Sequence, residues 1–464
     1  MNTAPLLLRN VERDGEQTNL RVENGCIALI GNVEARGAHE IDARGGALLP
    51  GLIDHHIHLY ATAARRASLD ASHLATRDEL VIALRGASEK RGQGQWIRAI
   101  GFDDTRLGLL SRADLDAVPN PVRLQDRTGA LWVLNSAALD LVLQHSTPTC
   151  VERDANGVPT GRIWRGDAWL RTRIQSTPPS LADLSNALAA WGVTGVTDAS
   201  VTNDPEQAAL FTHAKETGEL KQKLCLMSGD YIPRSERYEI GPLKILPDER
   251  DLPEVEHIAA RMRRARELKR NIAVHCVTAA ELAIALAAFE QIGAQASDRL
   301  EHGGIIPEAM FEDIKALRLT VVTQPNFIRD RGDRYAQTIA AEELPDLYRL
   351  ASLKRAGVKL AAGSDAPYGD PNPWSAIAAG TTRQTKSGQI LGEKEKLSAR
   401  DALSLYLGAF HAPAGPVRKI EIGAPADLCI LKTPLQDALN APDKVEVAAT
   451  IANGDIIYAD DAIA

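Results

Sequence analysis

Short apolar runs alternate with amphipathic stretches over residues 180–415. The amphipathic stretches, such as 254–269 and 278–293, have the spacing typical of helices. Strands that alternate with helices predict βαβ units and a parallel sheet. Counting one further run near the N-terminus, there are eight candidate strands, the number in a closed barrel, so we predict an α/β fold of the (β/α)8 TIM-barrel type. The eight runs are 51–59, 193–200, 223–228, 242–248, 271–276, 299–304, 319–325 and 358–365.

Both ends of the chain are rich in short β-like segments. Residues 1–50 and 416–464 contain stretches such as NLRVENGCIALIG and VAATIANGDIIYADD, whose alternation and glycine-bearing turns indicate strands. Because a two-stranded unit is marginally stable alone, we expect the two ends to pair into one small β-sandwich domain. The barrel then takes residues 51–59 and 181–415.

Residues 60–180 do not follow the alternation of the barrel. They form a long insertion directly after the first predicted strand. Loops that follow barrel strands lie on the catalytic face in this fold. We therefore expect this insertion to cap the active site.

Histidine and aspartate residues end several of the predicted barrel strands. His56 and His58 are two positions apart in the first strand, so both imidazoles point to one face. His275, His302 and Asp365 each end a later strand, where a barrel presents its active-site face. Any one of these residues alone also fits a buried structural role. Four histidines and one aspartate at strand ends together predict a divalent metal site.

The donor types in this set indicate the ion and the chemistry. Neutral imidazole suits Zn²⁺, with Fe, Co or Mn as substitutes. With three or fewer protein ligands for each metal, one position remains for a water molecule, whose pKa falls to about 7 when it is bound. Asp365 has lone pairs that can accept the proton from this water and pass it to a leaving group.

Lys244, within PLKIL, lies in a predicted barrel strand. An unmodified ammonium group has only donors and cannot ligate a metal, so a salt-bridged or snorkelling side chain is one interpretation. The other is that CO₂ adds to the amine. The resulting carbamate is a carboxylate that can bridge two ions, which leaves a small net charge in a half-buried site.

Composition narrows the class of protein. The chain has 464 residues, 53 Lys plus Arg against 61 Asp plus Glu, and a net charge of −8, which argues against a nucleic-acid partner. Its five cysteines form neither a disulfide framework nor a thiolate zinc site and suggest a reducing compartment. We find no secretory pattern at the N-terminus and no apolar run of about 18 residues, so we expect a cytoplasmic protein without a membrane segment.

The sequence resembles the amidohydrolase superfamily, and within it the YtcJ-like group that includes N-substituted formamide deformylase. The resemblance covers nearly the whole chain, in order. It is carried by PGLIDHHIH (50–58), VTGVTDAS (193–200), GPLKI (241–245), AVHCVTAAEL (273–282), LEHGGIIPE (300–308), TQPNF (323–327), GSDAP (363–367) and GAPADLCIL (423–431).

The resemblance implies a binuclear metal centre, most simply with two Zn²⁺ ions. In it, His56, His58 and Asp365 would bind one metal and His275 and His302 the other. Lys244, carboxylated on its side-chain nitrogen, would bridge the two. By analogy the protein would also be a homo-oligomer, a dimer or a tetramer, that acts on a small-molecule substrate.

One position departs from the YtcJ-like pattern. Members often have a histidine shortly after a glycine in the insertion, whereas Ala130 takes that place here, so a substrate contact could be missing. Arg127 and Trp132 are candidate substrate contacts nearby, although a tryptophan is more often part of a core. Asn326 and Tyr368 follow the last two barrel strands, where Tyr368 could donate to a developing oxyanion or simply pack in its loop.

Asn135 and Trp374 are two further candidates. Asn135 precedes the segment SAALDLVL and could equally be a helix N-cap. Trp374 follows the eighth predicted strand, where a packing role is the alternative.

The leading hypothesis for function is hydrolysis of a non-peptide C–N bond in an amide, formamide or carbamate. A second reading within the superfamily is deamination of a ring amidine or opening of a cyclic imide. Lys244 argues partly against it, because superfamily deaminases usually have one metal and lack the bridging lysine. A remote third reading is a non-catalytic assembly protein, but all six candidate ligands are present. The sequence does not reveal the substrate.

Overall fold

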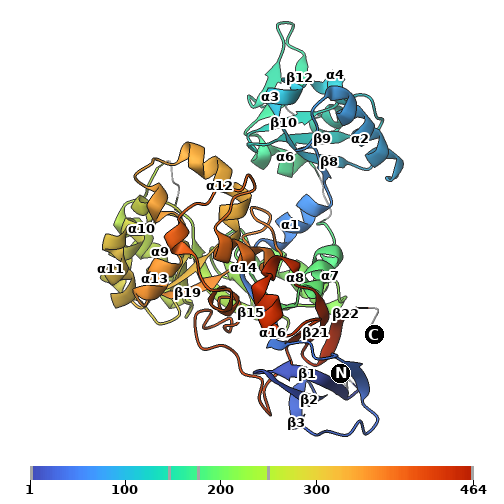
Figure 1. The fold of residues 1–464 in the computed structure, drawn as a ribbon. Coiled ribbons are helices and arrows are strands. Elements are labelled where there is room, and N and C mark those ends of the chain that lie inside the picture. Colours follow the sequence, from blue (N-terminus) through green and yellow to red (C-terminus); the bar gives the residue numbers. More distant parts are fainter. Residues whose placement is uncertain (1–3, 145–147, 175–177, 248–250, 461–464) are drawn as a thin grey trace. The chain divides into compact units, whose positions relative to one another are not determined.

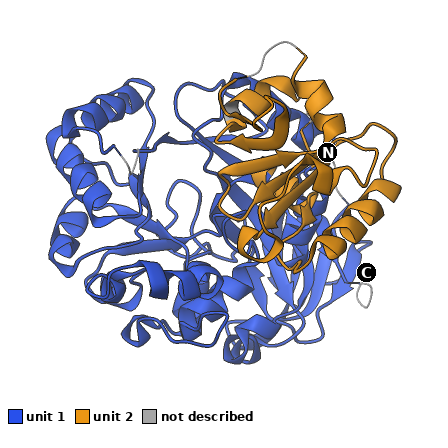
Figure 2. Ribbon diagram, turned by 90° about the horizontal axis from the view of Figure 1, so that it is seen from above, with its two compact units in different colours: residues 1–59, 181–464 blue, residues 60–180 orange. Residues whose placement is uncertain are grey.

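The computed structural model describes residues 4–144, 148–174, 178–247 and 251–460. The chain divides into two compact units, residues 1–59 with 181–464 and residues 60–180 (Figure 2). The second unit has the limits assigned above to the insertion. The two units are described separately below.

Eight parallel strands form the central sheet of the first unit (Figure 1). Each predicted apolar run overlaps one of them, although β15 begins three residues before its predicted run, and the predicted TIM-type barrel is confirmed. In sheet order they are β19 (Lys359–Ala362), β18 (Thr320–Thr323), β17 (Arg299–His302), β16 (Ile272–Cys276), β15 (Glu239–Ile245), β14 (Lys223–Ser228), β13 (Val193–Asp198) and β6 (Leu52–Ile57).

The first and last strands of this sheet approach each other, which brings the barrel close to closure. Asp365 N donates to His56 O at 2.7 Å, and His58 N donates to Ala366 O at 2.9 Å. Gly363 lies at the point of closest approach. A Cβ atom there would come within 2.4 Å of the backbone nitrogen of His56, so any larger residue would push the two strands apart.

Helices connect most of the strands, as the sequence pattern predicted. The segments 254–269 and 278–293 become α9 (Val255–Glu267) and α10 (Ala279–Ile292), and a Thr278–Glu281 capping box begins α10. Residues 229–238, all described, are an exception, because they join β14 to β15 without a helix. Other helices of this unit are α7 (Ala182–Ala190), α8 (Pro205–Glu216), α11 (Phe311–Ala316), α12 (Asn326–Thr338), α13 (Ala351–Arg355), α14 (Pro373–Thr382), α15 (Ala399–Ser404) and α16 (Leu435–Asn440).

The two chain ends build a pair of four-stranded sheets with a shared hydrophobic core. The N-terminal segment supplies one sheet and lends β5 to the C-terminal sheet, where Leu49 pairs with Cys429. The two ends therefore depend on each other. The first sheet is β3 (Cys26–Gly31), β2 (Glu16–Glu23), β1 (Leu6–Arg13) and β4 (His39–Asp42); the second is β22 (Asp455–Ala459), β21 (Val447–Ala452), β20 (Leu428–Leu431) and β5 (Leu48–Pro50).

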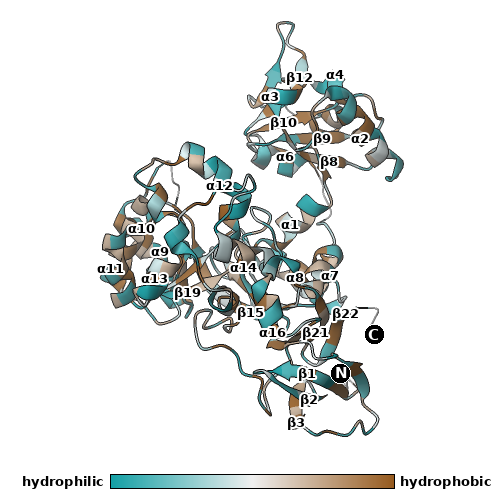
Figure 3. Ribbon diagram, in the orientation of Figure 1, coloured by the Kyte–Doolittle hydropathy of each residue, from teal (hydrophilic) through white to brown (hydrophobic). Residues whose placement is uncertain are grey.

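The second unit contains a six-stranded mixed sheet that the sequence pattern did not predict. Strands such as β8 and β10 are largely hydrophobic (Figure 3), and they pack against α2 (Arg77–Glu89) and α5 (Ser136–Val142). In sheet order the strands are β11 (Val151–Arg153), β12 (Pro159–Trp164), β10 (Leu131–Leu134), β9 (Val122–Asp126), β8 (Ile97–Phe102) and β7 (Leu69–Asp70).

Candidate metal centre

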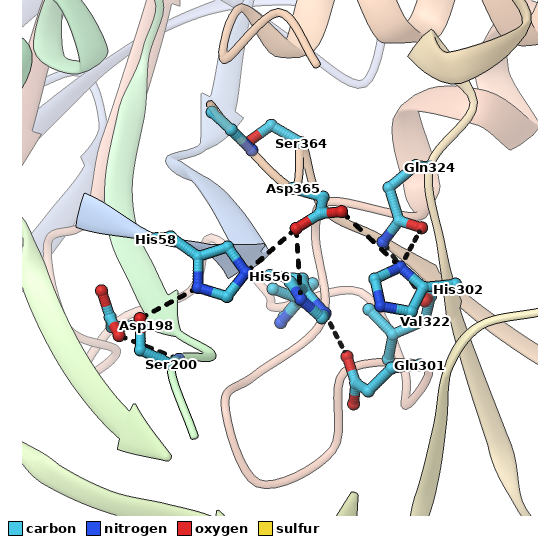
Figure 4. A network of polar contacts seen from close by, with 12 residues as sticks. His56, His58, Asp198, Ser200, Glu301, His302, Val322, Gln324, Ser364 and Asp365 are labelled. Atoms are coloured by element: carbon cyan, nitrogen blue, oxygen red, sulfur yellow. Dashed lines mark hydrogen bonds and ion pairs between the residues drawn. The ribbon is translucent and has the colours of Figure 1, made fainter. Parts of the chain in front are cut away.

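Asp365 lies at the centre of a cluster of histidines at the C-terminal ends of the barrel strands (Figure 4). Its Oδ1 is 3.1 Å from Nε2 of His58 and 3.5 Å from Nε2 of His56, and its Oδ2 is 3.8 Å from Nδ1 of His302. One ligand atom from each of His56, His302 and Asp365 lies within 4.8 Å of the others. This spacing allows several of these side chains to reach one ion.

His275 and Lys244 join the same cluster. The ring centroid of His275 is 4.5 Å from that of His302. Lys244 is 3% exposed, pairs in register with Ala273 on the next strand, and lies close enough for its charge to lower the pKa of His275. The structure therefore brings together all six residues proposed as ligands, while their role as ligands remains a prediction.

Each of three rings is held through its Nδ1 atom. His56 Nδ1 contacts the Glu301 carboxylate, His58 Nδ1 is 2.9 Å from Ser200 Oγ, and His302 Nδ1 is 2.9 Å from Gln324 Oε1. Metal-binding histidines typically use one ring nitrogen for the ion and the other for such a partner. In His56 the arrangement leaves Nε2 without a hydrogen-bond partner among the described residues, so this atom is available to a metal.

The electrostatics keep His56, His275 and His302 neutral and Asp365 charged. Burial, followed by the nearby charge of Lys244, lowers the pKa of His56 to about 4 and that of His275 to about 3. Burial alone would raise the pKa of Asp365, but the hydrogen bond from His58 and the charges of the neighbouring histidines hold it below its usual range. Neutral imidazole and carboxylate are the forms that bind metals.

Burial also lowers the pKa of Lys244. No hydrogen-bond partner for its Nζ is found in the part of the chain that the structure describes. Removing an ammonium group from water without a partner favours the neutral amine. A neutral amine has a lone pair and can act as a nucleophile.

Two of the residues with positive φ lie in this cluster. His302 has φ of 71° and Asp365 has φ of 50°, in the left-handed region that non-glycine residues seldom adopt. An extended strand would point Glu301 and His302 to opposite faces, yet Glu301 contacts His56 while His302 lies beside Asp365. The turn at His302 lets both neighbours serve one cluster.

Several residues of the cluster were missed from the sequence. Glu301 was not predicted, because alternation in an extended strand places it on the face opposite His302. Asp198 ends β13 and accepts from the backbone nitrogens of Leu59 and Ser200 at 2.8 and 3.1 Å, so it orients the serine that contacts His58. A polar residue at a strand end was the available signal for Asp198, whereas nothing in the sequence singled out Gln324.

The candidate substrate contacts after the last strands have different surroundings. Tyr368 is 57% exposed, and its ring centroid is 6.0 Å from that of His58, so it lies beside the cluster. Asn326 is buried, and its Nδ2 donates to Ser364 O at 2.9 Å. Asn326 thus holds the backbone next to Asp365. Trp374 is buried and donates to Trp191 O, which is a packing role.

The candidates in the insertion interact within their own unit. Arg127 forms an ion pair with Asp103 at 3.2 Å. Trp132 is 5% exposed in the core of the insertion, and its Nε1 donates to Asp167 at 2.8 Å, so the expectation of a substrate contact at Trp132 is replaced by a structural role. Asn135 is the N-cap of α5.

A cavity of about 700 Å³ lies apart from the metal-ligand candidates. Its lining includes Asn271, Ser297 and Phe410, and none of the six proposed ligands. Asn271 and Ser297 come just before β16 and β17, so the cavity lies near the N-terminal ends of these strands.

Within the described residues no helix is long and apolar enough to cross a membrane.

Comparisons with known proteins place this cluster in a family context. The model of the amidohydrolase family matches residues 39–458. N-substituted formamide deformylase of Arthrobacter pascens is 28% identical, with 94% of each chain covered, and YtcJ of Bacillus subtilis (strain 168) is 24% identical, with 96% of this chain and 97% of that protein covered. These matches confirm the resemblance to the YtcJ-like group.

Solved structures share the fold. An uncharacterized metal-dependent hydrolase of Pyrococcus horikoshii OT3 superposes with a TM-score of 0.76 at 22% identity, covering 92% of this chain and 97% of that one. N-isopropylammelide isopropylaminohydrolase of Burkholderia multivorans gives a TM-score of 0.57 at 16% identity, with 98% of each chain covered.

Proposed function

Because the chain belongs to the amidohydrolase family, we propose that it is a metal-dependent hydrolase that cleaves a C–N bond other than a peptide bond in a small molecule. One observation carries the proposal. His56, His302 and Asp365, from three separate strands, bring ligand atoms within 4.8 Å of one another beside a buried lysine.

The polar atoms of the cluster fit a metal. His56 Nε2 and Lys244 Nζ are buried without a hydrogen-bond partner among the described residues. Buried polar atoms normally have partners, so two such atoms in one cluster point to a ligand. A divalent cation matches the lone pairs of the imidazole and carboxylate atoms, and Zn²⁺ suits this donor set best.

Lys244 fits the cluster if its amine is carboxylated. The neutral amine attacks CO₂, an N–C bond forms, and the nitrogen releases one proton to the solvent. The product is a carbamate whose two oxygens can each bind an ion. We propose that this group bridges two metals, one held by His56, His58 and Asp365 and the other by His275 and His302.

The protein's own groups account for proton transfer and orientation. When bound, the ions polarise the substrate carbonyl and lower the pKa of a water molecule to about 7. The surroundings of Asp365 keep it a carboxylate, so it can accept a proton and return it to the leaving nitrogen. Tyr368, beside His58, is exposed enough to donate to the substrate oxygen.

The relatives suggest where to begin a search for the substrate. The deformylase of Arthrobacter pascens is similar over 94% of both chains, which makes N-substituted formamides the first class to test. Ala130 has no hydrogen-bonding side chain where YtcJ-like proteins often have a histidine, so the preferred compounds need not be the same. Amides and carbamates are the next classes.

The proposal is tested by metal content and product analysis on the purified full-length protein. We expect about two metal ions per chain, and release of an amine with formate or another acid from an N-substituted formamide, amide or carbamate. The Asp365→Asn variant is the matched control against contaminating hydrolases. Release of ammonia from a ring amidine would support the deaminase alternative, and a protein without bound metal would overturn the proposal.

A further inference from the structure

A buried ion pair extends from β17 to the metal-ligand candidates. Arg299 is 1% exposed and Glu301 is 0% exposed, and both point into the barrel from alternate positions of the strand. Arg299 donates to the Glu301 carboxylate through Nε and Nη2, with the Nη2 contact at 3.0 Å. The same carboxylate contacts Nδ1 of His56.

The chemistry of the three groups determines which ring nitrogen carries the proton. An arginine side chain only donates, so Glu301 must accept from it as a carboxylate. A carboxylate also accepts from His56, which requires a hydrogen on Nδ1. His56 Nε2 then has a free lone pair, and it lies 3.5 Å from Asp365 Oδ1.

Arg299 also fixes the backbone that carries the ligands. Its Nη2 donates to His55 O at 2.6 Å, the carbonyl directly before His56. β17 and β6 are not neighbours in the sheet, where β16, β15, β14 and β13 lie between them, so this bond joins two separate strands of the barrel. A single arginine thereby holds both the carboxylate that contacts His56 and the strand that carries it.

We infer that Glu301, held by Arg299, is a positioning residue that keeps His56 in the tautomer able to bind metal. The inference rests on the proposed function, because it assigns these residues a role toward the ion. Breaking such a partner of a metal-binding histidine typically weakens metal binding 10- to 100-fold.

Glu301→Gln is the direct test, because the amide keeps the size of the side chain. The amide offers one acceptor where the carboxylate offers two oxygens, and its NH₂ group must face either Arg299 or His56. We expect Zn²⁺ affinity, measured by competition with a chelator, to fall about 10- to 100-fold.

Asp298→Asn is the matched control. Asp298 is a fully buried carboxylate that also pairs with an arginine, Arg266, and it accepts from the backbone of Ile272 at 2.8 Å. It lies one residue before β17 and contacts no ligand candidate. Its loss should lower the melting temperature and leave Zn²⁺ affinity within about twofold of wild type.

The outcomes separate this inference from the proposed function. A wild-type protein that binds neither Zn²⁺ nor Fe²⁺, Co²⁺ or Mn²⁺ overturns the proposed function. If folded Glu301→Gln binds Zn²⁺ as tightly as the wild type, only the positioning role is overturned. The positioning role is also overturned if Asp298→Asn loses as much Zn²⁺ affinity as Glu301→Gln.

A measurement on wild-type protein keeps the inference testable if the Gln variant does not fold. Nitrogen NMR of ¹⁵N-histidine-labelled, chelator-treated protein reports which nitrogen of each ring carries hydrogen. The His56 signals are assigned by their loss in His56→Asn. Hydrogen on Nδ1 supports the inference, and hydrogen on Nε2 overturns it.

Discussion

The two ends of the barrel both bury charged side chains but differ in how these are satisfied. Arg270, just before β16, donates to Gly241 O at 2.9 Å, to Pro242 O at 2.8 Å and to Ser228 Oγ at 2.6 Å. Lys244, near the C-terminal end of its strand, is at least as deeply buried, yet its Nζ has no hydrogen-bond partner among the described residues.

This difference separates structural charges from functional ones. A buried charge whose partners all come from the chain contributes to a single stable fold. A buried polar atom that the chain leaves without a partner costs stability, and such atoms gather where a ligand will supply the missing interaction. The comparison therefore predicts separate effects on stability and on activity at the two ends.

The largest effect is expected for Asp365→Asn. The amide nitrogen cannot accept a proton, so turnover should fall by about 10³-fold or more while much of the metal stays bound. Turnover at saturating substrate and metal content of the same preparation check this prediction. Activity close to wild type would refute the proton-transfer role.

Lys244→Ala should remove the bridge between the ions. We expect about one metal per chain in place of two, with partial recovery of metal and activity on addition of formate, acetate or propionate. Elemental analysis with and without these acids measures the change. Lys432→Ala, at an exposed ion pair of the β-sandwich, is the control, and an unchanged metal content in Lys244→Ala would rule out the bridge.

Arg270→Met should affect stability alone. The substitution leaves the acceptors of the guanidinium without a donor, so the free energy of unfolding should fall by about 4 kcal/mol. Denaturant titration measures the loss, and metal content below the unfolding transition should stay at the wild-type value. A loss of metal from folded Arg270→Met would show that the two ends are not independent.

The smallest effect concerns pH. His56 has a pKa of about 4 in the folded chain against 6.5 for an unperturbed histidine. Because the unfolded chain binds this proton more tightly, the free energy of unfolding is not reduced by His56 above pH 6.5. It falls as the pH drops from 6.5 toward 4, by about 3 kcal/mol in total. Urea unfolding of metal-free protein at pH 7.5 and pH 4.5 should show the loss, and His56→Asn should reduce it. An identical loss in the variant would assign the pH dependence to other groups.

The barrel and the six clustered residues could be predicted from the sequence because both depend on local patterns. Each barrel strand is a short apolar run between polar segments, and the HxH spacing of His56 and His58 has one geometric meaning in a strand. The ends of parallel strands then bring His302 and Asp365 to the same face.

The rest depends on contacts between distant segments. Glu301 and its neighbour His302 both contribute to the cluster because of a left-handed turn at His302, which no alternation rule anticipates. The six-stranded sheet of the insertion was missed because its strands do not alternate regularly with helices, and its order is not sequential. Whether this unit caps the active site remains a prediction.

The position of the insertion in the chain has a consequence for how the protein can evolve. The inserted unit begins after β6 and ends before α7, and β6 and β13 are neighbouring parallel strands. Without it, β6, α7 and β13 would still form an ordinary βαβ unit. His56 and His58 precede the departure, and the other four candidate ligands follow the return. Insertions, deletions or replacement of residues 60–180 during evolution would therefore leave all six candidate metal ligands unchanged.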